Sequence, residues 1–205
     1  MNTTTSSVDR STLRRWVLWI VLSVIGLAIG MVVGLQILWT AGESVEAAIG
    51  QIGVLTLAGA IIGASVGLGL GLGQWAVMRS LIARAWRWPL MSGGCGLVAG
   101  AALVGLVALL SGAPEDAPPL LMAAIFILIG ASIGLGQWLL LRGVADHPAR
   151  AIIGTALGVG LGLMAMFGLG GEGREWVSLT AGALIAAVAT GWGIASSAIR
   201  QNVRR

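Results

Sequence analysis

Six long apolar runs constrain the fold of this chain more than any other feature of its sequence. They cover roughly residues 16–39, 52–78, 89–111, 120–141, 151–171 and 177–199. A helix needs about 20 apolar residues to cross a bilayer. The chain is 57% hydrophobic and only 10% charged, whereas about a quarter of the residues in a soluble domain are charged. The runs therefore predict an all-α membrane protein with six transmembrane helices.

The charged residues divide the connections between these runs into two classes. Every arginine except Arg174 falls in the N-terminal tail, in the second or fourth connection, or in the C-terminal tail, and the other three connections carry acidic residues such as Glu43, Glu115 and Glu172. The positive-inside rule then places both termini in the cytoplasm. We predict a disordered cytoplasmic tail over residues 1–15, a transmembrane domain over 16–199 and a cytoplasmic tail over 200–205.

Tryptophans cluster near the predicted ends of the runs, where an aromatic belt would lie at the membrane interface. This group comprises Trp16, Trp19, Trp39, Trp75, Trp86, Trp88, Trp138 and Trp176. In the second connection, the stretch LIARAWRWP alternates arginine with tryptophan. We predict that it forms a short interfacial helix that binds anionic lipid at the cytoplasmic face.

One nine-residue motif occurs twice, as GLGQWAVMR and GLGQWLLLR. Its shared residues are Gly71, Gln74, Trp75 and Arg79 in the first copy and Gly134, Gln137, Trp138 and Arg142 in the second. Each copy ends a run and is followed by a short connection and another run. In these following runs, Gly96 and Gly100 correspond to Gly158 and Gly162. The repeat unit is therefore a helical hairpin present twice in the same orientation. We also consider a pseudo-threefold ring, in which the first and sixth runs pack side by side as a third hairpin.

The motif has a structural interpretation and a functional one. Tryptophan and arginine four residues apart share one helix face, and each glutamine continues a stripe of glycines that permits close helix packing. A membrane hydrogen bond contributes about 0.6 kcal/mol on average, so we expect Gln74→Leu and Gln137→Leu to fold nearly normally. In the functional alternative, Ser65, Gln74, Ser132, Gln137 and Thr155 form the polar lining of a pathway.

The repeat resembles a pattern found in uncharacterised bacterial multi-pass membrane proteins, which carry Gly-x-x-Gln-Trp-x-x-x-Arg at helix ends. The resemblance covers the segments around residues 67–105 and 130–167. It implies a bacterial cytoplasmic (inner) membrane location, and it implies no activity and no catalytic or binding residue.

The runs lack the residues that membrane enzymes and proton-coupled pumps use, since they contain no Asp, Glu, Lys or His. The single histidine, His147, lies in the fourth connection, and the single cysteine, Cys95, lies within a run. We therefore predict no catalytic residue, no cofactor, no metal site and no enzyme activity. The arginines are dispersed and form no basic stripe, so we also predict no nucleic-acid partner.

These observations favour an accessory or scaffold protein that packs, through glycine-lined helix faces, against itself as a homo-oligomer or against a membrane-protein partner. The alternative is a small channel or transporter for a neutral solute or ion. A dry, close-packed bundle would favour the scaffold, and a polar tunnel reaching Gln74 and Gln137 would favour the passage.

Overall fold

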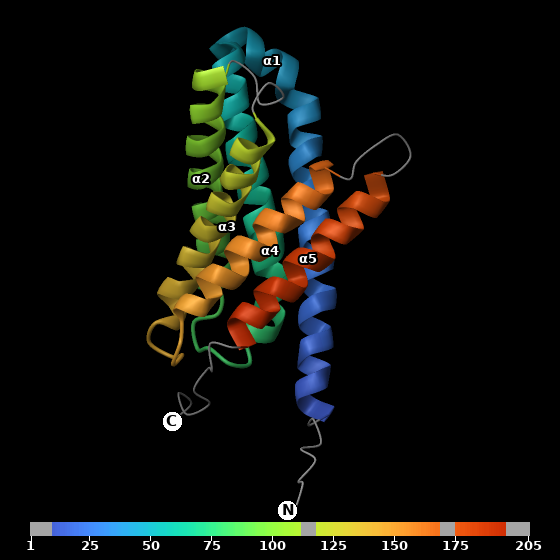
Figure 1. Ribbon diagram of the computed structural model, residues 1–205, viewed down its shortest axis with the longest axis vertical. Helices are drawn as coiled ribbons and strands as arrows, with labels where there is room; N and C mark the ends of the chain where they lie inside the picture. The colour runs from blue at the N-terminus through green and yellow to red at the C-terminus, as the bar shows by residue number, and fades with distance from the viewer. Residues whose placement is uncertain (1–9, 112–117, 169–174, 196–205) are drawn as a thin grey trace, which may run out of the picture.

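The computed structural model describes residues 10–111, 118–168 and 175–195. Its helices are α1 (Arg10–Met78), α2 (Arg87–Ser111), α3 (Pro119–Leu141), α4 (Ala149–Gly168) and α5 (Glu175–Ala195). Helix α1 runs the length of the molecule, bends and returns, so it contains two spans, Leu13–Thr40 and Ser44–Met78 (Figure 1). With α2 to α5 these make six helices long and apolar enough to cross a membrane. The predicted all-α membrane architecture is confirmed.

Helix α1 differs from the sequence expectation at its start and at its bend. It begins at Arg10, so the last residues of the predicted tail are helical, and residues 1–9 lie outside the described part of the chain. The predicted connection between the first two runs is also helical as far as Ile49. The helix breaks at Gly50, whose φ of 72° lies in the left-handed region that glycine adopts without steric cost.

The connections at 79–86 and 142–148 are short turns. Residues 80–86 form turns in which the Arg87 and Trp88 amides donate to the carbonyl oxygens of Arg84 and Ala85. The predicted interfacial helix is therefore wrong, because this stretch is too short to do more than reverse the chain. Helix α3 begins with Pro119 at its first turn, a position that proline suits because its nitrogen needs no partner there.

The helices form a ring in chain order. Neighbouring helices pack closely along the whole series from α1 to α5, and α5 returns to contact α1. At this closing contact Gly191 of α5 faces the rings of Trp16 and Trp19. The first and sixth spans thus lie side by side, as the ring hypothesis required, while its threefold symmetry stays a prediction. Helices α4 and α5 cross α1 obliquely (Figure 1).

Glycine permits the closest of these approaches. A Cβ added at Gly26 would overlap the carbonyl oxygen of Gly69, and one added at Gly63 would overlap that of Gly96. On the other side of the ring, a Cβ added at Gly154 would lie 2.6 Å from the Cα of Gly193. The glycine stripes are therefore occupied by helices of the same chain, because only an absent side chain lets two backbones come so close.

The predicted match between Gly96 and Gly158 does not hold in these contacts. Gly96 faces Gly63 in the preceding helix of its own hairpin, whereas Gly158 faces Ala186 of α5. The two positions look alike in sequence because both belong to glycine stripes with a spacing of four. They pack on opposite neighbours in the ring.

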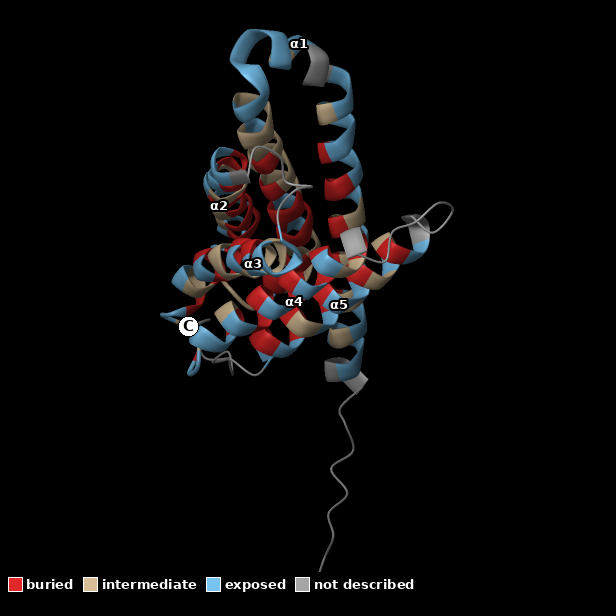
Figure 2. Ribbon diagram, turned by 45° about the horizontal axis from the view of Figure 1, so that its top comes forward, coloured by how far each residue is buried: buried red, intermediate tan, exposed pale blue. Residues whose placement is uncertain are grey.

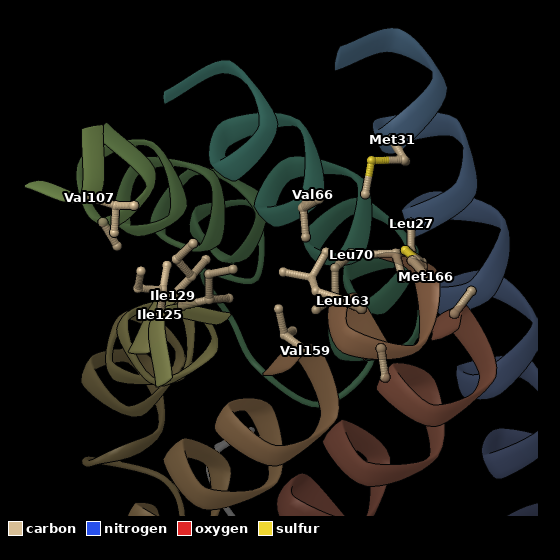
Figure 3. Close-up of a cluster of buried hydrophobic side chains, with 14 residues drawn as sticks. Leu27, Met31, Val66, Leu70, Val107, Ile125, Ile129, Val159, Leu163 and Met166 are labelled. Carbon is tan, nitrogen blue, oxygen red and sulfur yellow. The ribbon is translucent and has the colours of Figure 1, made fainter. Parts of the chain in front are cut away.

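An apolar cluster fills the middle of the bundle (Figure 3). Val66 and Leu70 of α1 meet Val159 and Leu163 of α4, and Ile129 of α3 packs into the same cluster. The remaining gap beside Val66 and Val159 has no room for a water molecule. Buried residues face this interior and exposed ones face outward, except around the bend of α1, which is exposed on both sides (Figure 2).

Candidate functional site: a buried polar layer

Each of the six spans contributes one uncharged polar side chain to a buried layer near the arginine-rich end of the bundle. We define this end by the start of α1, the turns at 79–86 and 142–148, and the end of α5. The polar layer consists of Ser23, Gln74, Ser92, Gln137, Thr155 and Thr190, and every member is 0% exposed. On α2 to α5 and the second span, these residues lie four to six positions from the helix end. That places the layer about 6 to 9 Å inside the bundle.

Gln74 is the centre of the layer. Its Oε1 accepts hydrogen bonds from Trp88 Nε1 at 2.8 Å and from Gln137 Nε2 at 3.0 Å. Its Nε2 donates to Thr190 Oγ1 at 3.3 Å. The two donors on one oxygen fix the orientation of the amide, because only the carbonyl side of a glutamine can accept.

Gln137 extends the hydrogen-bonded layer to the other half of the ring. Its Oε1 accepts from Thr155 Oγ1 at 2.9 Å, and its Nε2 also approaches Ser92 Oγ at 3.4 Å. Helices α1 and α3, which carry the two glutamines, are not among the closely packed pairs. The glutamine side chains therefore bridge the centre of the ring and connect helices that are not close-packed neighbours.

Hydrogen bonds join four members of the layer in one continuous series of neutral groups. Thr155 donates to Gln137, Gln137 to Gln74 and Gln74 to Thr190, and Thr190 donates to the carbonyl oxygen of Ala187 at 3.2 Å. No member titrates near neutral pH, so this chain of groups contains no site for a stable charge. Its chemical capacity is to hold helices together through hydrogen bonds that are shielded from lipid.

Two polar groups of the first span are buried but are not hydrogen-bonded to the rest of the layer. Ser23 Oγ and Trp19 Nε1 are both buried and have no hydrogen-bond partner among the residues that the structure describes. They lie four positions apart and so share a face of α1. The polar layer thus reaches all six spans, and its side-chain hydrogen bonds join five of them.

The tryptophan and arginine of the first motif meet as expected. The Arg79 guanidinium lies over the Trp75 ring, 5.5 Å from its centroid. Trp88, in contrast, is fully buried and donates to Gln74, and Trp19 is also buried. Their assignment to an aromatic belt is wrong, because position near a helix end does not reveal which face of the helix turns inward.

The structure brings together three of the five candidate pathway residues. Gln74, Gln137 and Thr155 are hydrogen-bonded in the polar layer. Ser65 instead packs beside Gly34 at the contact between the first two spans. Ser132 lies on the outer side of α3, where its hydroxyl donates to the Leu128 carbonyl at 2.9 Å.

The sequence alone did not identify three members of the layer, Ser23, Ser92 and Thr190, or Trp88, which donates to it. One signal could have identified Ser92 and Thr190. Each is a hydroxyl residue in an otherwise apolar stretch, at about the same distance from the arginine-rich end as Gln74 and Gln137. The indole of Trp88 carries no comparable signal.

In the described ranges, no three His, Cys, Asp or Glu side chains gather closely enough to hold a metal ion. Comparisons with protein-family models, with curated proteins and with solved structures found no match to this chain.

Proposed function

We propose that this integral membrane protein is a non-enzymatic scaffold or accessory subunit rather than a passage for solutes. The observation that carries the proposal is the state of the polar layer. Its two glutamines are fully buried, and their amides bond to other protein groups. Beyond the layer the interior is apolar and has no room for water beside Val66 and Val159. A conducting pathway needs polar groups that face water.

Fewer glycine-lined helix faces are available to a membrane-protein partner than the sequence suggested. Most glycine stripes are used within the chain, so the partner would contact the exposed aliphatic faces. Ile25 and Ile29 of α1 and Leu184 and Val188 of α5 are such residues. Exposed aliphatic side chains are equally suited to lipid, so the partner must be found by experiment.

The proposed setting is the bacterial inner membrane, with both termini and the arginine-rich end in the cytoplasm and anionic lipid against that end. Its support is the arginine distribution and the even number of spans.

We further propose that the repeated motif marks two equivalent hairpins. Gly71 lies against Pro89 and Ser92, and Gly134 lies against Ile152 and Thr155. Gly134, Ile152 and Thr155 lie 63 residues after Gly71, Pro89 and Ser92, respectively, and Gln137 lies 63 residues after Gln74. Ser92 and Thr155 would then be equivalent members of the polar layer, and Ser23 would be their counterpart on the first span.

Two experiments test the scaffold proposal. Purified protein in liposomes should leave the permeability to water, urea, glycerol and potassium equal to that of protein-free liposomes. Photoreactive residues placed at Ile29 and Val188 in cells should crosslink to a discrete protein, with Leu68 and Leu157 as further exposed positions for comparison. Flux well above the protein-free level, lowered by Gln74→Leu, would favour the passage. Crosslinks to lipid alone at every position would contradict the scaffold.

A further inference from the structure

We propose that a lateral hollow between α2 and α3 is a binding site for one anionic phospholipid. The hollow has a volume of about 680 Å³, within the range of ligand sites. Its lining includes Leu90, Gly94, Val98 and Leu103 of α2 and Leu128 and Leu135 of α3. It extends from one turn inside the arginine-rich end to beyond the middle of α2.

The lining is suited to hydrocarbon. Its polar side chain, Ser132, already donates to the Leu128 carbonyl. A Cβ added at Gly94 would meet nothing within 4 Å, in contrast to the packed glycines on the other side of α2. The hollow is therefore open at Gly94, where the absent side chain leaves a slot between the two helices. An acyl chain can fill such a slot without a hydrogen-bond partner.

The helix register places one arginine on each side of the mouth of the hollow. Arg87 lies three positions before Leu90, and Arg142 lies seven positions after Leu135, so both arginines continue the lining faces of their helices. Both side chains are exposed, and the Arg87 guanidinium lies 5.4 Å from the centroid of the Trp86 ring. Two guanidinium groups at headgroup depth suit a phosphate with a net negative charge.

The same charges disfavour the other occupants of an apolar groove. A partner helix would have arginine or lysine at its own cytoplasmic end by the positive-inside rule. A second copy in the membrane would bring its own arginine-rich end to this mouth. Either would place like charges together, whereas an anionic lipid neutralises Arg87 and Arg142.

The test uses the full chain in nanodiscs with phosphatidylglycerol or phosphatidylcholine that carries a photoreactive acyl chain. We expect adducts on the α2 and α3 peptides that line the hollow, with a higher yield for phosphatidylglycerol. Arg87→Gln and Arg142→Gln should each lower that yield about fivefold, the factor that corresponds to about 1 kcal/mol per arginine near an anionic surface. Arg14→Gln on α1, with the same loss of charge, should leave it unchanged.

Gly94→Phe tests the hollow itself. The open space at Gly94 lets the variant fold, which its melting temperature will verify, and the ring should abolish most of the adduct. Leu97→Phe is the control, because Leu97 is exposed on the same helix and is not part of the lining. Equal yields for both headgroups, or unchanged yields in folded Gly94→Phe, would overturn the proposal. Disulfide or bismaleimide crosslinking of Cys95 between two chains would also overturn it, because Cys95 lines the hollow and would then face a second copy.

Discussion

Replacement of Gln74 by leucine should destabilise the bundle more than a single membrane hydrogen bond suggests. The sequence alone predicted nearly normal folding for this variant. In the structure Gln74 makes three side-chain hydrogen bonds, to Trp88, Gln137 and Thr190. At about 0.6 kcal/mol each, their loss amounts to about 2 kcal/mol.

The indole of Trp88 adds to that loss. Its N–H is fully buried and cannot turn toward another acceptor without moving the ring. A buried donor that loses its partner costs about 1 to 3 kcal/mol. The apolar contacts of the new leucine offset part of this cost. We therefore expect Gln74→Leu to lower the free energy of unfolding by about 2 kcal/mol or more.

The assay is equilibrium unfolding in mixed micelles of dodecylphosphocholine and sodium dodecyl sulfate, followed by tryptophan fluorescence. Gln36→Leu is the matched control, because Gln36 is exposed and should change stability by less than about 0.5 kcal/mol. A double-mutant cycle with Trp88→Phe should give a coupling of about 0.6 to 1.7 kcal/mol. Equal unfolding midpoints for Gln74→Leu and Gln36→Leu, with no coupling to Trp88, would refute the reasoning.

Three further predictions concern packing and topology. Gly67→Leu and Gly134→Leu should each lower the melting temperature more than Gly34→Leu. A Cβ added at Gly67 or Gly134 meets backbone atoms of Ser92 or Ile152, whereas one added at Gly34 meets the movable side chain of Ser65. Equal melting temperatures for the three variants would contradict this. Cysteines at Trp16 and Gly191, in a chain with Cys95→Ala, should join within one molecule through a short bismaleimide linker, and crosslinks found only between molecules would mean that the ring is open. In the same background, cysteines at Ser7 and Glu115 should label from opposite sides of the membrane; labelling of both by an impermeant reagent on intact cells would disprove the proposed topology.

Much of the fold could be predicted because lipid imposes strong rules on sequence. The length of the apolar runs identified the spans, and each glycine stripe identified a face of close contact. The position of the break in α1 was harder to predict, because the sequence of residues 40–49 is compatible with either helix or loop. The structure places the break at Gly50, which has a positive φ. Which neighbour a glycine faces was not predictable, as Gly158 shows, because a spacing of four fixes a helix face but not what packs on it.

The polar layer could be predicted only in part for a related reason. Gln74 and Gln137 stand out as amides in apolar helices, yet their meeting across the ring depends on the helix arrangement. Trp88 lies next to Arg87 near a span end, where a belt residue and a buried donor have the same local sequence. Only the position of Gln74 Oε1 decides between them. Ser65 and Ser132 were candidate pathway residues but lie outside the polar layer. A hydroxyl in a membrane helix can also donate to its own backbone, as Ser132 does, or pack against a glycine, as Ser65 does.

We propose that the polar layer is closed to water and joins the helices. The most direct measurement is water-edited solid-state NMR on protein in bilayers with 15N-labelled glutamine side chains. The side-chain amides of Gln74 and Gln137 should receive little magnetisation from water, while that of Gln51, exposed beside the bend of α1, receives it quickly. If the amides of Gln74 and Gln137 receive magnetisation from water as fast as that of Gln51, the layer faces a water-filled path and is not closed.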